Sequence, residues 1–396
     1  MRKYYFELAV LTVIASVVGL VVGVLDTIFG RILLFISDFR VQHVNSLIPF
    51  LALAGLAITF AYQKIGKESV RGMGLVFAVG HNEASVIPKR LIPLVVGATW
   101  LTHLFGGSAG REGVAVQIGA TFANFLGNVL KIKENRHIMI MIGMSAGFAG
   151  LFQTPLAASL FAVEALTAGK LYTRALLPSL AAAYTASTTS HLLGLEKFST
   201  KLAQIPELSF ENVWKIIIIA IIFGLTGYLF SSLLAYAKAK LTHIFPNPYL
   251  KIAIGSVILS ILLIILWQGR YSGLGTNLIA ASFENGTIFP VDFAFKLILT
   301  IITLAIGFQG GEVTPLFAIG ATLGIVLASI FGLPLAFVAA LGYAAVFASA
   351  TNTLLAPMFI GVEVFGFNTL PFMLIAVAIA YTFNFDSSIY GAQKKL

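Results

Sequence analysis

The sequence places two charged residues inside a glycine-rich turn that directly precedes an apolar run. In "GSAGREGVAVQIGAT" at 107–121, Arg111 and Glu112 lie between Gly110 and Gly113. Two further glycine-rich turns precede apolar runs, at Gly72-Met73-Gly74 and at Gly310-Gly311-Glu312-Val313-Thr314-Pro315. Glycine lets backbone approach a ligand closely, and the free N–H groups at a helix start favour an anion. Three such turns predict an anion site lined by backbone amides; the alternative is that each is a tight turn that packs against small residues.

The composition predicts that these turns lie in a membrane protein. The 396 residues are 58% hydrophobic and 10% charged, with a mean hydropathy of +0.95. Soluble domains carry about 25% charged residues, and a soluble fold could not bury this much apolar surface. We therefore expect an all-α polytopic protein in a lipid bilayer, and we exclude soluble enzyme and nucleic-acid-binding folds.

The positive charge is distributed as expected for cytoplasmic loops. The net charge is +9, and the lysines and arginines cluster between apolar runs: Arg2 and Lys3; Lys64, Lys67 and Arg71; Lys131, Lys133 and Arg136; Lys238 and Lys240; Lys394 and Lys395. This pattern is typical of loops retained on the cytoplasmic side, so we expect both termini there. The first apolar region is too long for a signal peptide, which makes it the first membrane helix. The absence of cysteine excludes disulfides and thiol ligands.

Apolar segments are expected at fourteen places: 6–29, 47–63, 91–105, 114–130, 138–151, 155–168, 175–193, 213–236, 249–267, 293–308, 315–331, 334–350, 354–366 and 368–383. Several are shorter than the roughly 20 residues that a spanning helix needs, which predicts broken or re-entrant helices. We expect one transmembrane transport domain over 1–396, with halves of about 1–193 and 213–396, a polar linker at 194–212, and no appended soluble domain.

The two halves repeat one another. "VAVQIGATFANFLG" at 114–127 matches "PLFAIGATLGIVLA" at 315–328, and "TPLAASLFAVEAL" at 154–166 matches "TLLAPMFIGVEVF" at 353–365. The offsets are 201 and 199 residues. About seven apolar segments separate the two copies of the first motif, and an odd count predicts an inverted repeat. Transporters of this kind bind substrate at the amino termini of broken helices.

"GREGVAVQIG", "GMSAGFAGLFQTPLAASLFAVEAL" and "GGEVTPLFAIGATLG" resemble the CLC family of anion channels and proton-coupled anion antiporters, over about residues 70–395. The resemblance implies that Glu112 is the external gate and proton acceptor. It also implies that Met73 occupies the position of an anion-binding serine, that the amides of Glu312 and Val313 contact the central anion, and that Tyr390 contacts the same anion. The predicted anion-binding set is Met73, Gly74, Gly110, Arg111, Gly113, Glu312, Val313, Thr314 and Tyr390.

The sequence departs from the family pattern in four motifs, at five positions. Methionine replaces serine at Met73, and Val76 and Val114 replace prolines. Val313 replaces a phenylalanine, and Ala165 occupies the position of an internal proton-transfer glutamate after Glu164. These departures resemble the fluoride-transporting bacterial branch. Methionine donates no hydrogen bond to a larger halide, whereas backbone N–H groups can replace the water around fluoride.

The other intramembrane polar groups are expected to be structural. Glu164 and Glu363 occupy equivalent positions in the repeat, which predicts hydrogen bonds to neighbouring helix ends. Asp26 is expected at an interfacial helix end. Phe148 and Phe152 are expected to pack against lipid or in the core, and the alternative is that one of their rings reaches the anion pathway. No histidine spacing is typical of a metal site, so we expect no metal and no cofactor.

The expected function is proton-coupled fluoride antiport that exports cytoplasmic fluoride, by a multi-pass homodimer in a bacterial cytoplasmic membrane. The alternative is a chloride/proton antiporter or a passive anion channel of the same fold. A receptor or scaffold would be expected to carry a cytoplasmic domain. A membrane enzyme would need a nucleophile–base pair or metal cluster beside the turns, so we expect no enzyme.

Overall fold

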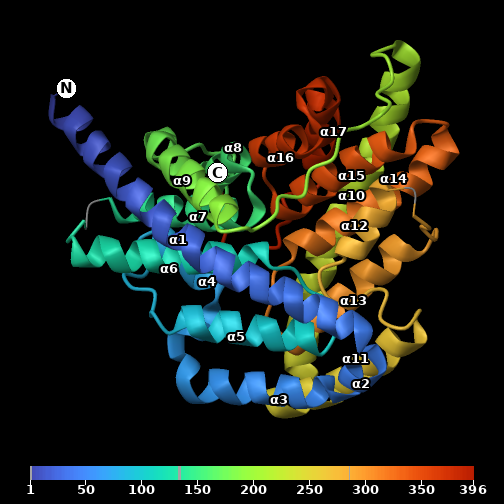
Figure 1. Ribbon diagram of the computed structural model, residues 1–396, viewed down its shortest axis with the longest axis horizontal. Coiled ribbons are helices and arrows are strands. Elements are labelled where there is room, and N and C mark those ends of the chain that lie inside the picture. Colours follow the sequence, from blue (N-terminus) through green and yellow to red (C-terminus); the bar gives the residue numbers. More distant parts are fainter. Residues whose placement is uncertain (1, 133–134, 285) are drawn as a thin grey trace.

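The computed structural model describes residues 2–132, 135–284 and 286–396, and it is almost entirely helical (Figure 1). Five helical stretches are long and apolar enough to cross a membrane: Tyr4–Gln42, Val44–Gly80, Phe210–Ile244, Pro248–Ile265 and Val313–Phe331. Most of the others are shorter. Lys133, one of the basic residues noted above, lies outside the described residues. The all-α membrane fold with broken helices is therefore confirmed.

The first half of the chain contains α1 (Arg2–Gln42), α2 (Val44–Leu47), α3 (Leu51–Ala61), α4 (Met73–Gly80), α5 (Leu91–Leu104), α6 (Glu112–Val129), α7 (Arg136–Phe152), α8 (Pro155–Glu164) and α9 (Leu176–Leu192). The second half contains α10 (Phe210–Ile244), α11 (Pro248–Ile265), α12 (Thr276–Phe283), α13 (Asp292–Ile306), α14 (Val313–Phe331), α15 (Leu335–Thr351), α16 (Leu355–Phe365) and α17 (Leu370–Thr382). Short helical turns connect them at η1 (Ile48–Phe50), η2 (Tyr62–Gly66), η3 (Lys67–Arg71), η4 (Thr173–Ala175) and η5 (Phe367–Thr369). The strands β1 (Thr167–Ala168) and β2 (Lys394–Lys395) pair in parallel.

The fourteen expected apolar segments all overlap helices, but the end of the first was wrong and one helix was missed. The first segment does not end at residue 29, because α1 continues to Gln42. Gly30 is a packing contact and not a stop: a Cβ there would lie 2.9 Å from Leu151 Cδ1. The eight residues of α12 were missed because the segment is too short to give a periodic pattern.

The expectation for Asp26 was also wrong. This residue lies inside α1 and is completely buried, because α1 continues past it and α7 packs against it. A Cβ on Gly150 of α7 would lie 2.5 Å from Asp26 Oδ2. The side chain therefore lies at a helix–helix contact, not at the membrane interface.

The inverted repeat is visible in the pairing of α8 with α16. Glu164, at the end of α8, accepts hydrogen bonds from the first amides of α16, at 2.9 Å from Leu355 and 2.7 Å from Ala356. Glu363, near the end of α16, accepts from the first amides of α8, at 3.1 Å from Leu156 and 2.8 Å from Ala157. Each helix end thus holds the other helix's start, which requires the two equivalent helices to run antiparallel. The structural role expected for both carboxylates is confirmed.

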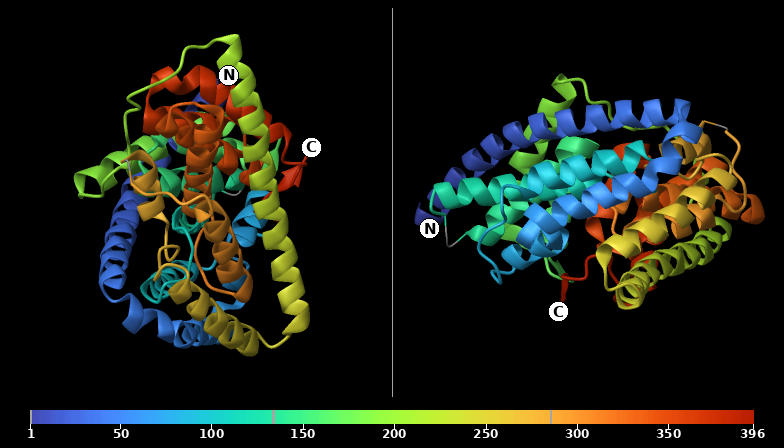
Figure 2. Two further views of the ribbon diagram at one scale, coloured as in Figure 1. Left: turned by 90° about the vertical axis from the view of Figure 1, so that its right-hand side faces the viewer. Right: turned by 90° about the horizontal axis from the view of Figure 1, so that it is seen from below.

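Small residues allow equivalent helices of the two halves to pack at the same close distance. A Cβ on Gly119 of α6 would lie 2.0 Å from the Gly143 carbonyl oxygen of α7, and a Cβ on Gly320 of α14 would lie 2.0 Å from the Gly342 oxygen of α15. Close backbone contact of this kind drives helix association in lipid. The longest helices, α1 and α10, lie on opposite sides of the molecule (Figure 2, left view). Between Leu192 and Phe210, in the predicted linker, the chain contains no helix or strand.

The α6–α7 contact predicts a stability difference between two glycine variants. Gly119→Ala should destabilise the protein by about 1–3 kcal/mol or more, because the new methyl group overlaps backbone that cannot move away. Gly97→Ala on α5 is the matched control, since no atom of the described residues lies within 4 Å of its Cβ position. Thermal unfolding in detergent measures both. Equal unfolding temperatures would contradict the close packing of α6 on α7.

Candidate anion site at two paired helix starts

The turns before α6 and α14 bind each other through their backbones. Gly110 and Gly311 form an antiparallel bridge, in which the Gly110 N–H donates to the Gly311 oxygen at 2.5 Å and the Gly311 N–H donates to the Gly110 oxygen at 2.7 Å. Both residues must be glycine, because a Cβ on either would lie 3.0 Å or less from atoms of the other half. The two residues are equivalent in the repeat, so the symmetry axis passes between them. The bridge places the amino termini of α6 and α14 side by side.

A buried lysine fixes the segment that leads into the first turn. Lys296 of α13 is completely buried, and its ammonium donates to Ser108 Oγ at 2.9 Å and to the Gly273 oxygen at 2.7 Å. The Ser108 N–H also donates to Thr303 Oγ1 at 3.1 Å. The residues just before Gly110 are therefore attached to α13, which leaves the turn little freedom to shift.

Glu112 is the first residue of α6, and its side chain reaches the start of α14. Its side chain is 1% exposed, and Oε2 accepts hydrogen bonds from the Thr314 N–H at 3.2 Å and from the Thr314 hydroxyl. The Arg111 N–H lies 3.3 Å from the same oxygen, and Arg111 Nε lies 3.7 Å from Oε1. A carboxylate thus occupies donors at a helix amino terminus, where negative charge is favoured.

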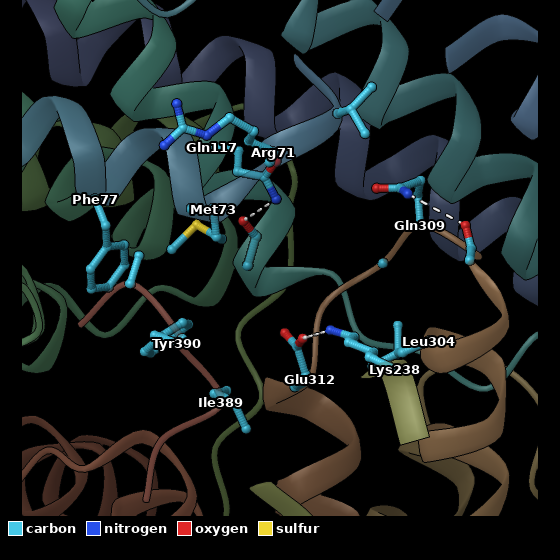
Figure 3. Close-up of a pocket in the computed structure, with 18 of the residues that line it drawn as sticks. Arg71, Met73, Phe77, Gln117, Lys238, Leu304, Gln309, Glu312, Ile389 and Tyr390 are labelled. Atoms are coloured by element: carbon cyan, nitrogen blue, oxygen red, sulfur yellow. Dashed lines mark hydrogen bonds and ion pairs between the residues drawn. The ribbon is translucent and has the colours of Figure 1, made fainter. Parts of the chain in front are cut away.

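A cavity of about 470 Å³ extends from this point between the two halves (Figure 3). Five predicted site residues line it: Met73, Gly74, Gly113, Glu312 and Tyr390. The other five, Gly110, Arg111, Glu112, Val313 and Thr314, form the bridged turns at its end. The predicted site missed other lining residues, among them Gln117 and Lys238, although Gln117 stands out as a polar residue in the apolar run after "GREG". Lys238 Nζ lies 3.9 Å from Glu312 Oε1.

Tyr390 is held in the cavity by aromatic packing and by the chain that follows it. Its ring stacks on Phe77 of α4 with 5.3 Å between centroids and meets Phe161 edge-on at 6.0 Å. Beyond it, β2 pairs with β1, and Lys394 Nζ lies 2.6 Å from Glu83 Oε1. This hydrogen bond and the charge of Lys394 hold the pKa of the exposed Glu83 carboxyl below its ordinary value.

Phe148 and Phe152, expected in the core, are buried. Phe148 stacks on Phe161, and Phe152 stacks on Phe317.

Comparison with known proteins identifies the family. A family model described as voltage gated chloride channel matches residues 54–384. The chain belongs to this CLC family. A chloride/fluoride channel protein of Pseudomonas syringae pathovar tomato is 35% identical over 392 residues, covering 96% of this chain and 85% of the relative.

Two solved structures support the assignment at different levels. A CLC-type fluoride/proton antiporter has a TM-score of 0.98 and 55% identity, and the match covers 99% of both chains. A slow cyanobacterial chloride/proton antiporter has a TM-score of 0.83 at 21% identity, covering 94% of both chains, which supports the fold alone.

The two carboxylates that join α8 and α16 predict a loss of stability on neutralisation. Glu164→Gln or Glu363→Gln turns an amide NH2 toward backbone N–H donors, so each should destabilise the protein by about 1–3 kcal/mol. Glu207→Gln, at an exposed position, is the control. Thermal unfolding of the purified variants measures the effect, and unchanged melting of both core variants would contradict the reciprocal helix-end bonds.

Proposed function

We propose that this protein exports fluoride from the cytoplasm in exchange for protons, with Glu112 as both gate and proton acceptor. One observation carries the proposal: the Glu112 carboxylate occupies the Thr314 amide and hydroxyl at the end of the cavity. A carboxylate and a fluoride ion require the same donors, so each excludes the other. The similar antiporter of known structure, at 55% identity, supports the assignment to fluoride and protons.

Competition for these donors couples the two ions. An ionised Glu112 binds the start of α14 as a tethered anion. Protonation removes its charge, so it no longer competes with fluoride and leaves the site with its proton. Fluoride then binds the freed N–H and O–H donors, and the remaining free amides at the glycine-rich turns replace its lost water. Net movement of fluoride therefore requires Glu112 to take up and release a proton.

Met73 supports fluoride over chloride as the substrate. Its thioether lines the cavity beside the start of α4, where a serine would offer a hydroxyl donor. A larger halide that keeps part of its hydration gains from such a donor, whereas fluoride can be held by closely placed amides. Chloride/proton antiport and passive anion conduction on the same fold are the alternatives. The name of the Pseudomonas relative, a chloride/fluoride channel protein, agrees with the alternative of passive anion conduction.

The proposed orientation places the cavity on the cytoplasmic side. Arg71 and Lys238 line the cavity, and Lys394 and Lys395 follow shortly after Tyr390. Basic residues are retained on the cytoplasmic face of membrane proteins, so the cavity would open inward and both termini would lie inside. We further propose a homodimer in a bacterial cytoplasmic membrane, with one pathway in each subunit and with repeat halves of 1–193 and 213–396.

Met73→Ser should reduce the preference for fluoride. The new hydroxyl can donate to chloride, and a hydrogen bond to a charged group contributes about 1.5–3 kcal/mol, so the fluoride-to-chloride flux ratio should fall about tenfold or more. Ion-selective electrodes measure both fluxes from proteoliposomes. Met73→Leu is the matched control, because it removes the sulfur but adds no donor and should keep the preference. An unchanged ratio in the serine variant would assign selectivity to other residues.

Glu112→Gln should abolish coupling, because the amide cannot ionise or carry a proton. In proteoliposomes with an outward fluoride gradient, wild-type protein should drive protons inward against their gradient, and the variant should not. Glu164→Gln serves as the control, since that carboxylate is bonded to α16 and should leave coupling intact. Fluoride-driven proton uptake at the wild-type rate in Glu112→Gln would disprove the proposed mechanism.

A further inference from the structure

Gln117 has an unused hydrogen-bond acceptor at the wall of the cavity. It lies on α6, near the start of the helix, and its side chain is 7% exposed (Figure 3). Its Nε2 donates to the Gly113 carbonyl oxygen at 3.2 Å. That contact fixes the orientation of the amide, because turning it around would place two oxygen atoms against each other.

The other end of the amide finds no partner among the described residues. Oε1 is buried and accepts no hydrogen bond from the described chain. It faces the turn before α4, where a Cβ on Gly72 would lie 3.2 Å from it. Glycine at position 72, with a φ of +50°, keeps this space open. Buried acceptors without a partner are rare in folded proteins and require a specific explanation.

A carbonyl oxygen identifies the kind of ligand that it can take. It repels fluoride, which is itself an acceptor, and it binds a group that carries a proton. Among the other cavity groups, Lys238 Nζ lies 3.9 Å from Glu312 Oε1, and the Tyr390 ring is stacked on Phe77. The carboxyl of Glu112 belongs to the residue directly before Gly113, whose carbonyl holds the Gln117 amide. When protonated, the Glu112 carboxyl is a strong hydrogen-bond donor.

We propose that Gln117 Oε1 binds the protonated Glu112 carboxyl once this has left the start of α14. The inference rests on the proposed function, because it requires Glu112 to move with its proton. In this position the acid O–H donates to the amide oxygen and the proton stays on Glu112. Release then transfers it to water in the cavity, and the restored carboxylate returns to Thr314.

A hydrogen-bond acceptor at this position stabilises the protonated Glu112 carboxyl as it crosses a poorly hydrated space. An acid group without a partner in that space would be strongly disfavoured. The carboxylates Glu164 and Glu363 cannot bind the protonated Glu112, because both already accept hydrogen bonds from amides at helix starts. An amide oxygen accepts the hydrogen bond but is too weak a base to remove the proton. Gln117 is thus a binding residue for the protonated gate, and not a second proton carrier.

The test replaces the amide with an unbranched apolar side chain of similar length. In Gln117→Met, protons moved per fluoride should fall to about one third to one tenth of the wild-type value, as expected for one lost hydrogen bond. Thr121→Val is the matched control: it lies on the same helix, and its hydroxyl bonds only the Gln117 backbone oxygen. The control should keep the wild-type stoichiometry.

A second measurement does not depend on transport. In infrared difference spectra, the C=O band of the protonated carboxyl that disappears in Glu112→Gln should shift to the frequency of a less hydrogen-bonded acid in Gln117→Met. An unchanged band together with an unchanged proton-to-fluoride ratio would overturn the proposal. That result would leave the proposed function intact, because the latter fails only if Glu112→Gln still couples the two ions.

Discussion

The site depends on the antiparallel bridge between Gly110 and Gly311. Two backbone hydrogen bonds, at 2.5 and 2.7 Å, join the turns before α6 and α14 where side chains would keep them apart. Because of this contact, two helix amino termini from distant parts of the chain face one small volume. The positive ends of both dipoles and the unpaired N–H groups then act together, in surroundings from which water is largely excluded.

The bridge is symmetric, but the residues around it are not. At the repeat offset, Arg111 corresponds to Glu312, Glu112 to Val313, and Gly113 to Thr314. Glu112 can therefore reach across to the Thr314 amide and hydroxyl, whereas Val313 has no group with which to make the reciprocal bond. The fold supplies two equivalent helix starts, and this difference in side chains lets only the first half place a carboxylate on the start of the other half's helix.

Polar groups elsewhere in the membrane region hold the frame of the site. Lys296 binds Ser108 and the Gly273 carbonyl, while Glu164 and Glu363 join α8 to α16. Each of these groups has its partners in place, which is what burial in lipid demands. Glu112 also has partners, but two of them, the Thr314 amide and hydroxyl, belong to the opposite half of the repeat and are donors that an anion would use. This difference in hydrogen-bond partners distinguishes Glu112 from Glu164 and Glu363.

The sequence determined the elements and the chemistry of the site. Apolar runs, glycine-rich turns and the offsets of 201 and 199 residues were sufficient to predict most of the helices and the repeat, and the resemblance to the family supplied the prediction that Glu112 is the gate. Tertiary structure decided what local patterns cannot encode. Whether Gly30 ends α1 or packs on Leu151, and whether Asp26 lies at an interface or against Gly150, depends on which helix lies beside it. The positions of Lys296 and Gln117 likewise follow from contacts between segments far apart in the chain or from the wall of a cavity. Burial and hydrogen bonding at such points are properties of two surfaces together, and one stretch of sequence specifies only one of them.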